Sequence, residues 1–161
     1  RRSKIDLKRI SLNQLIEKTL FLNANLLKIN NVTIKTDLNS QLPDFYGSED
    51  QLQQVFMNLV SNAAESMGET DGGILTVNTV YSAENDVIFI KFNDTGIGIH
   101  NENISKLFEP FFTTKERDKG TGLGLSTVYG IVKQHDGDIQ VKSEPGKGYV
   151  FKIYLKAKIG N

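Results

Sequence analysis

Four short motifs occur in a fixed order along this chain. They are residues 58–63 (NLVSNA), 94–99 (DTGIGI), 108–115 (FEPFFTTK) and 120–125 (GTGLGL). Each motif alone is a weak signal, because paired asparagines and glycine turns occur in many proteins. Their order and intervals together are far more specific than any one of them.

Apolar spacing and turn residues predict the elements that carry these motifs. Ser11 with Gln14, and Ser48 with Gln51, form capping boxes that are followed by apolar residues at helical spacing. They predict one helix over residues 11–28 and a second that begins at residue 48 and carries the first motif. Two further helices are predicted at residues 102–107 and 123–135. Alternating apolar residues predict strands at residues 32–38, 74–81, 87–92, 139–142 and 150–155. This order indicates an α+β fold, in which helices cover one face of a mixed sheet in a two-layer sandwich.

The balance of charges limits the partners that the chain can attract. Lysine plus arginine equals aspartate plus glutamate at 19 each, so no global positive field draws the chain to nucleic acid or anionic lipid. A length of 161 residues, 39% of them hydrophobic, suits one domain with its own core. There is no cysteine and no apolar run of membrane-spanning length. We therefore expect a soluble, cytoplasmic domain that binds no nucleic acid and makes no direct membrane contact.

The first motif places two carboxamides on one face of a helix. Asn58 and Asn62 lie four residues apart, so both project from the face opposite the apolar residues. An amide carbonyl can bind Mg²⁺ beside phosphate and water without adding negative charge. The same pair would also suit an exposed polar helix face, and the spacing alone leaves both interpretations open.

The second motif follows directly after a predicted strand. An ionised Asp94 accepts hydrogen bonds and cannot donate them, which suits the exocyclic amine of adenine and opposes the carbonyl of guanine. Gly96 and Gly98 permit positive φ and allow the chain to pass beside a flat ring. An ordinary turn after a strand has the same sequence pattern, and for this motif alone that alternative stays open.

The third and fourth motifs predict a flexible lid with apolar anchors. Phe108 and the two phenylalanines that follow it supply these anchors, and Lys115 offers a charge to phosphate. Gly120, Gly122 and Gly124 alternate before a helix, so their backbone N–H groups can face phosphate at a helix N-terminus. They lack the Gly-Lys-Ser/Thr of a P-loop and are one residue short of the dinucleotide-binding fingerprint.

Together these motifs resemble the asparagine, first glycine, phenylalanine and second glycine boxes of the ATP-binding catalytic domain of two-component sensor histidine kinases. The resemblance runs from about Ser11 to Leu155, and residues 146–151 (GKGYVF) resemble the third glycine box. The stretches NLVSNAAESM and LFEPFFTTK are similar to those of nitrogen-regulation and sporulation kinases. The resemblance implies the Bergerat ATP-binding fold, with a mixed and mostly antiparallel sheet.

The resemblance also implies ATP and Mg²⁺ as ligands and a role for each motif residue. Asn62 would coordinate Mg²⁺, while Asn58 and Lys115 would act on the phosphates as catalytic residues. Asp94 would recognise adenine. The other positions that the resemblance assigns to ATP binding are Gly96, Gly98, Ile99, Phe108, Gly120, Thr121, Gly122, Leu123, Gly124 and Leu125. Glu65 and Tyr149 depart from the family pattern, in which lysine and a small hydroxyl residue are common at these places.

One further departure separates kinases of this kind from related ATPases. Gyrase, HSP90-like proteins and mitochondrial protein kinases resemble one another in carrying glutamate four residues before the metal-binding asparagine, where this chain has Asn58. An amide cannot act as a general base towards water or serine. This favours transfer of phosphate to an imidazole, which is already a nucleophile when neutral.

The chain has no segment like the His-Glu-x-x-Asn-Pro sequence that carries the phosphoacceptor of a sensor kinase. We expect neither His100 nor His135 to be the acceptor. Residues 1–10 are therefore predicted to be the remnant of a preceding dimerisation helix or linker, and residues 11–161 the catalytic domain. The implied partners are the kinase's own dimerisation domain within a homodimer and a response regulator receiver domain, and the full-length protein can be membrane-anchored.

Three hypotheses follow from the sequence. The first is an ATP:histidine phosphotransferase domain. The second is an ATPase or serine kinase of the same fold, against which the missing glutamate counts. The third is a degenerate nucleotide-binding module that only docks partners, against which the intact Asn62, Asp94 and glycine boxes count.

Overall fold

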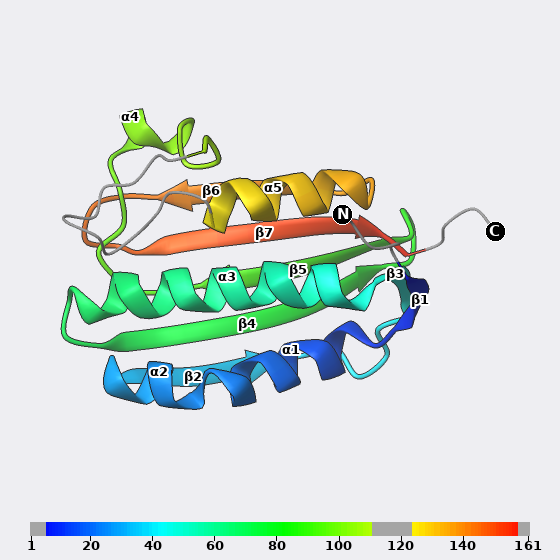
Figure 1. Ribbon diagram of the computed structural model, residues 1–161, viewed down its shortest axis with the longest axis horizontal. Coiled ribbons are helices and arrows are strands. Elements are labelled where there is room, and N and C mark those ends of the chain that lie inside the picture. The colour runs from blue at the N-terminus through cyan, green and yellow to red at the C-terminus, as the bar shows by residue number, and fades with distance from the viewer. Residues whose placement is uncertain (1–5, 111–123, 158–161) are drawn as a thin grey trace.

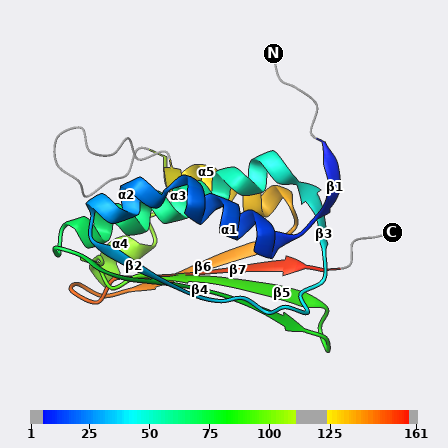
Figure 2. The same ribbon diagram turned by 90° about the horizontal axis from the view of Figure 1, so that it is seen from below.

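The computed structural model describes residues 6–110 and 124–157 as two layers, a twisted sheet and a group of helices packed on one of its faces. Figure 2 shows that the helices lie on the same side of the sheet. The α+β prediction is confirmed. The apolar side chains between the layers form one continuous core.

The main sheet has five strands in the order β2-β4-β5-β7-β6. Within the described residues β2 pairs with β4 in parallel, and the pairs β4 with β5, β5 with β7 and β6 with β7 are antiparallel. The mixed, mostly antiparallel sheet is therefore confirmed. Its strands are β2 (Val32–Asp37), β4 (Gly73–Ser82), β5 (Val87–Asn93), β6 (Asp138–Ser143) and β7 (Tyr149–Lys156).

Buried and exposed residues alternate along the central strands, because one face of the sheet meets the helices. In β7 the side chains of Tyr149, Phe151, Ile153 and Leu155 face inward and are buried. In β5 the buried side chains are Ile88, Ile90 and Phe92. This alternation is the period of two that predicted the strands from the sequence.

The helices that cover the sheet are α1 (Leu12–Leu22), α2 (Ala24–Ile29), α3 (Glu49–Gly68) and α5 (Gly124–Gln134). A short helix, α4 (Asn101–Ile104), lies at one end of the molecule. The longest helix, α3, begins at the Ser48 side chain, which accepts a hydrogen bond from the backbone N–H of Gln51 at 3.2 Å. Ser48 is therefore the predicted N-cap, but the return bond of the capping box is not formed, because the N–H of Ser48 donates to Nε2 of His135.

The single helix predicted over residues 11–28 is wrong in detail, because Asn23 interrupts it. Asn23 lies outside the helical region at φ −104° and ψ 16°. Its side-chain Nδ2 donates to the carbonyl of Thr19 at 2.9 Å and contacts Sδ of Met57 on α3 at 3.2 Å. A short amide that bonds nearby backbone competes with the helical hydrogen-bond pattern, which explains the break.

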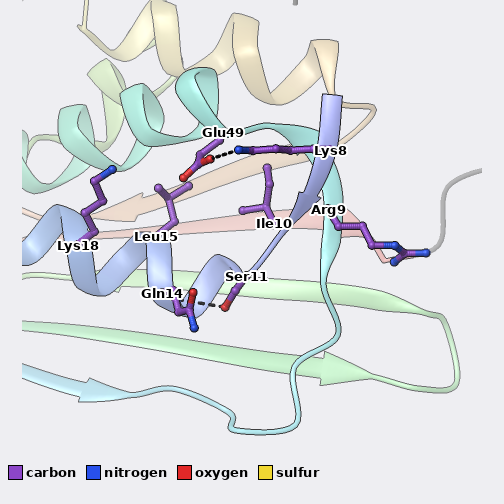
Figure 3. Close-up of a pocket in the computed structure, with 8 residues that line it drawn as sticks. All are labelled: Lys8, Arg9, Ile10, Ser11, Gln14, Leu15, Lys18 and Glu49. Carbon is purple, nitrogen blue, oxygen red and sulfur yellow. Dashed lines mark hydrogen bonds and ion pairs between the residues drawn. The ribbon is translucent and has the colours of Figure 1, made fainter. Parts of the chain in front are cut away.

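A second, two-stranded sheet joins β1 (Leu7–Ile10) to β3 (Phe45–Ser48), and the sequence did not predict it. Residues 7–10 are thus extended, although we expected residues 1–10 to continue a helix or linker. Figure 3 shows that Lys8 Nζ of β1 pairs with Glu49 Oε1 of α3 at 2.8 Å. The origin of residues 1–10 in a preceding domain stays a prediction.

Candidate functional site

The predicted site residues that the structure describes lie at one end of the molecule. The C-terminal half of α3, the loop after β5, the turn between β6 and β7 and the beginning of α5 all lie at the end that carries α4 (Figure 1). The second motif follows β5 directly, as expected. Three of the four motifs therefore meet at this end, at least in the parts that the structure describes.

Polar residues four apart form a stripe along α3. Asn58 and Asn62 were predicted, and Ser66 is the next member of the same stripe. Asn58 accepts a hydrogen bond from Gln54 Nε2 through Oδ1 and donates through Nδ2 to the carbonyl of Gly124, both at 3.0 Å. This last bond ties α3 to the first residue of α5, where the fourth motif ends.

Asn62 carries an unsatisfied polar atom. Its Nδ2 is buried and has no hydrogen-bond partner among the described residues. An unpaired buried polar group costs roughly 1–3 kcal/mol, so such an atom is expected where a ligand completes the site. A half-turn of the carboxamide would bring its carbonyl oxygen to the same place, and that oxygen is a suitable ligand for Mg²⁺. The residue therefore fits a metal beside a phosphate.

Acidic and histidine residues do not form an alternative metal centre in the described residues. No group of three or more His, Cys, Asp or Glu side chains is placed to hold an ion in those parts of the chain. A divalent metal at this end would accordingly depend on Asn62 together with oxygens from the nucleotide and water.

Asp94 is the buried acid of the site, with a side chain that is 3% exposed. Its Oδ1 accepts three hydrogen bonds, from the N–H of Gly96 at 2.8 Å, the N–H of Tyr149 at 3.2 Å and the hydroxyl of Ser66 at 3.3 Å. Its Oδ2 accepts none from the described residues. Oδ2 is therefore the oxygen that a ligand can use as an acceptor.

Burial raises the pKa of the Asp94 carboxyl to about 6, and the hydrogen bonds from Gly96, Tyr149 and Ser66 act in the opposite direction. At pH 7 the carboxylate is mostly ionised and can only accept hydrogen bonds. A strongly perturbed acid in a buried position is typical of functional sites.

Glycines near Asp94 allow segments to approach one another closely. Gly98 has a φ of +69°, and a Cβ there would collide with the Glu144 carbonyl oxygen. Gly148 has a φ of +77°, and a Cβ there would collide with the Asp94 carbonyl oxygen. The positive φ predicted for Gly98 is confirmed.

For Gly96 the predicted reason is wrong, because this residue does not have a positive φ. A Cβ at Gly96 would instead collide with the Ser66 hydroxyl and lie 2.6 Å from the Ser66 carbonyl oxygen. The glycine is needed because the loop after β5 packs directly on α3. Ile97, the next residue, donates its N–H to Ser66 Oγ at 3.0 Å and to the Ser66 carbonyl at 3.1 Å.

Ser143 connects the second motif to the turn between β6 and β7. Its Oγ accepts from the N–H of Ile99 at 2.9 Å and donates to the carbonyl of Gly148 at 2.7 Å. Ile99 is itself buried. Sequence reasoning missed both Ser66 and Ser143, because a serine gives no signal until the segments that it joins are known.

Tyr149 contributes to the site through its backbone. Its carbonyl accepts from the N–H of Asp94 at 2.9 Å, while its own N–H donates to the Asp94 carboxylate. Its buried ring stacks on Phe151 with centroids 5.6 Å apart, and burial raises the pKa of its hydroxyl to about 12. The core thus accommodates the Tyr149 side chain at a position where the resembled family commonly has a small hydroxyl residue.

Phe108 is the one lid anchor that the structure describes. It is half-buried and stacks on Tyr129 of α5, with ring centroids 5.4 Å apart. Its position against α5 agrees with the prediction of an apolar anchor. The other predicted lid residues lie outside the described residues, and their roles stay predictions; they are Phe111, Phe112, Lys115, Gly120, Thr121, Gly122 and Leu123.

The fourth motif ends in the first turn of α5. Gly124 begins the helix and its carbonyl accepts the Asn58 amide, while Leu125 is half-buried and packs against the core. The predicted helix start at residue 123 is therefore nearly correct. The contact of Leu125 with a nucleotide stays a prediction.

His135 is a structural residue. Its Nε2 accepts from the N–H of Ser48 at 3.1 Å, and its Nδ1 lies 2.9 Å from the carbonyl of Ile131. One nitrogen therefore accepts and the other donates, which is the pattern of a neutral ring with both nitrogens in use. This arrangement supports the prediction that His135 is not the phosphoacceptor.

A separate hollow lies at the opposite end of the molecule, between β1, α1 and the start of α3. It encloses about 430 Å³ and contains no residue of the four motifs. Figure 3 shows Lys8, Arg9 and Lys18 around it, with Lys8 paired to Glu49.

None of the helices within residues 6–110 and 124–157 is long and apolar enough to cross a bilayer.

Comparison with known proteins gives one matching family. Its profile, described as histidine kinase-, DNA gyrase B-, and HSP90-like ATPase, matches residues 47–159. Sporulation kinase E of Bacillus subtilis is 41% identical over 145 residues, which is 90% of this chain and 19% of that protein. The sensor histidine kinase ZraS of Escherichia coli is 36% identical over 153 residues, which is 95% of this chain and 32% of that protein. The chain thus spans about a fifth to a third of the length of these relatives.

Solved structures share the fold. The nucleotide-free catalytic domain of the histidine kinase ThkA gives a TM-score of 0.82 at 27% identity, and the match covers 95% of this chain and 99% of that one. The mycobacterial sensor histidine kinase MprB gives a TM-score of 0.80 at 20% identity and covers 98% of this chain. The predicted Bergerat-type architecture is confirmed by these matches.

Proposed function

Because the chain belongs to the histidine kinase-, DNA gyrase B- and HSP90-like ATPase family, we propose that it is the ATP-binding catalytic domain of a sensor histidine kinase. In this role it binds Mg·ATP and transfers the γ-phosphate to a histidine on a separate dimerisation domain. One observation carries the proposal. The Asp94 carboxylate is buried and fixed through Oδ1, and its Oδ2 remains available as an acceptor.

Asp94 gives the site its preference for adenine. The exocyclic amine of adenine donates to Oδ2, whereas guanine would place a carbonyl oxygen against the same atom. Two acceptors facing each other in a buried site leave both without a partner, which costs more than the loss of one hydrogen bond. The same carboxylate therefore favours ATP and opposes GTP.

Asn62 acts at the phosphates of the nucleotide in this proposal. Its carboxamide can hold Mg²⁺, which when bound neutralises charge on the phosphate oxygens. Asn58, fixed by Gln54 and by the Gly124 carbonyl, holds α3 against the start of α5. The proposed roles of Lys115, Gly120 and Gly122 in phosphate binding rest on their chemistry, because a positive charge and backbone N–H groups stabilise anions.

The transfer itself requires no general base from this domain. The unprotonated nitrogen of a neutral imidazole attacks the γ-phosphorus with its lone pair, the bond from that phosphorus to the bridging oxygen breaks, and ADP leaves. The phosphorylated ring then loses the proton of its other nitrogen to solvent. Attack by water would require removal of a proton, which the Asn58 amide cannot accept. This difference favours the histidine kinase over the ATPase and serine-kinase alternative.

The test combines this chain with a separately expressed dimerisation domain of the same parent protein. Alone, the chain should bind Mg·ATP without appreciable hydrolysis or self-labelling. With the dimerisation domain added, radiolabel from [γ-³²P]ATP should appear on that domain as an acid-labile, alkali-stable phosphoramidate, because proximity supplies the nucleophile.

The other outcomes separate the alternatives. Labelling of serine or threonine, or rapid ATP turnover by the chain alone, would favour the ATPase or serine-kinase hypothesis. Absence of nucleotide binding would leave the docking module. A response regulator receiver domain as the next phosphate acceptor, assembly as a homodimer and a cytoplasmic location belong to the same proposal.

A further inference from the structure

Ser66 occupies a position that no motif assigns. It is 5% exposed and follows Asn62 by one further helical step on α3. Its Oγ contacts two groups of the loop after β5, the N–H of Ile97 at 3.0 Å and Oδ1 of Asp94 at 3.3 Å. The hydroxyl therefore links the helix of the asparagine motif to the acid of the glycine motif.

The direction of these two bonds is determined by their partners. The N–H of Ile97 can only donate, so Ser66 Oγ must accept there. An ionised Asp94 can only accept, so the hydroxyl proton of Ser66 must point to Oδ1. A serine hydroxyl has one proton, and in this arrangement it is committed to the carboxylate.

This commitment affects which carboxylate oxygen a ligand meets. The Ser66 hydroxyl joins the N–H groups of Gly96 and Tyr149 on Oδ1, so donors from three segments hold the same oxygen. The carboxylate cannot rotate without breaking all three bonds. Oδ2 is thereby held in one direction, and an acceptor that is fixed before binding loses little entropy when a ligand arrives.

We propose that Ser66 is a positioning residue that orients the Asp94 carboxylate towards the exocyclic amine of the bound base and so sets the preference for adenine. The inference rests on the proposed nucleotide binding by this site. We expect Ser66 to affect recognition of the base and not of the phosphates, because its hydroxyl contacts Asp94.

The test compares two nucleotides in wild type and in Ser66→Ala. ATP carries the exocyclic amine, and purine riboside triphosphate has hydrogen in its place. Because a hydrogen bond to a charged group contributes more than a neutral one, Ser66→Ala should weaken ATP binding by about tenfold. Binding of purine riboside triphosphate should change by less than about twofold, since that ligand makes no bond to Oδ2. Isothermal titration calorimetry measures both affinities.

A matched control separates positioning from stability. Ser48→Ala removes another buried serine, the N-cap of α3, which lies at the opposite end of that helix from Ser66. It should lower the melting temperature, as loss of an N-cap does, and leave the ATP affinity unchanged. If Ser66→Ala is poorly folded, Ser66→Cys keeps the size of the side chain with a weaker donor and should give an intermediate loss for ATP.

Two results are decisive against the inference. Equal losses for both nucleotides in Ser66→Ala would mean that the serine supports the fold of the pocket and does not act on the amine. An unchanged ATP affinity in Ser66→Ala would remove its role altogether. In contrast, failure of the wild-type chain to bind either nucleotide would refute the proposed function itself.

Discussion

Replacing Asp94 by asparagine keeps the shape of the side chain and removes its charge, so the variant isolates the contribution of the carboxylate. The asparagine Oδ1 can still accept from Gly96, Tyr149 and Ser66. The amide nitrogen then occupies the place of Oδ2 and points its own protons at the adenine amine. Two donors meet, and the bond to the base is lost.

The magnitude follows from the charge on the lost acceptor. A hydrogen bond to a charged group contributes roughly 1.5–3 kcal/mol, which corresponds to about 10- to 150-fold in the dissociation constant. The stability of the fold should change in the opposite direction. Burial raises the pKa of Asp94 from 3.8 to about 6, so the ionised form is disfavoured in the folded state at pH 7. Removing that charge should increase the free energy of unfolding by about 1–3 kcal/mol.

Calorimetry with ATP at pH 7.5 and denaturant unfolding measure these two effects on the same samples. Asp136→Asn is the matched control, because Asp136 is exposed and has a φ of +60°, which asparagine also tolerates. It should change neither quantity appreciably. An unchanged ATP affinity in Asp94→Asn, or equal affinities of the wild type for ATP and GTP, would refute the base-recognition reasoning.

Three further predictions concern the surroundings of the site. The affinity for ATP should be full above about pH 6 and should fall as the pH drops through this value, because the Asp94 carboxylate, whose pKa is raised, takes up a proton there. Calorimetry across pH 5 to 8 measures this affinity, and a flat profile would contradict the prediction. Gly98→Ala should destabilise the chain by more than about 1 kcal/mol, because φ is +69° and the added Cβ meets the Glu144 carbonyl; a melting temperature within about 1 °C of wild type would contradict this. Asn62→Ala should abolish the gain in ATP affinity on adding Mg²⁺, and a preserved Mg²⁺ dependence would exclude Asn62 as the metal ligand. The stability of the fold should stay nearly unchanged, because the Asn62 amide nitrogen is buried without a partner among the described residues.

The sequence predicted those elements whose signal lies within a short window. The N-cap at Ser48 and the alternation along β7 each depend on neighbouring residues, and both are present in the structure. The pairing of β1 with β3 depends on contacts between segments about 40 residues apart, and each strand has only four residues. Strands this short show too little alternation to be distinguished from loop.

The sequence indicated the charged and amide residues of the proposed site and gave no signal for its hydroxyls. Asp94 and Asn58 carry functional groups whose chemistry limits what they can bind. Ser66 and Ser143 have roles that arise only because the loop after β5 packs against α3 and against the turn before β7. Gly96 illustrates the same limit, since its contact with Ser66 replaces the conformational role predicted for it.

The spacing along α3 joins the two halves of the proposed chemistry. One helical step of four residues rises about 6 Å, so Asn58, Asn62 and Ser66 lie at successive levels on one face. Ser66 contacts Asp94, the acid that we propose recognises the base, and Asn58 contacts the start of α5. Asn62, between them, has an amide nitrogen without a partner among the described residues, at the level where we propose that the metal lies. A rigid helix therefore sets the distance between base and phosphates, and a substitution that bends α3 should impair both ends of the site together.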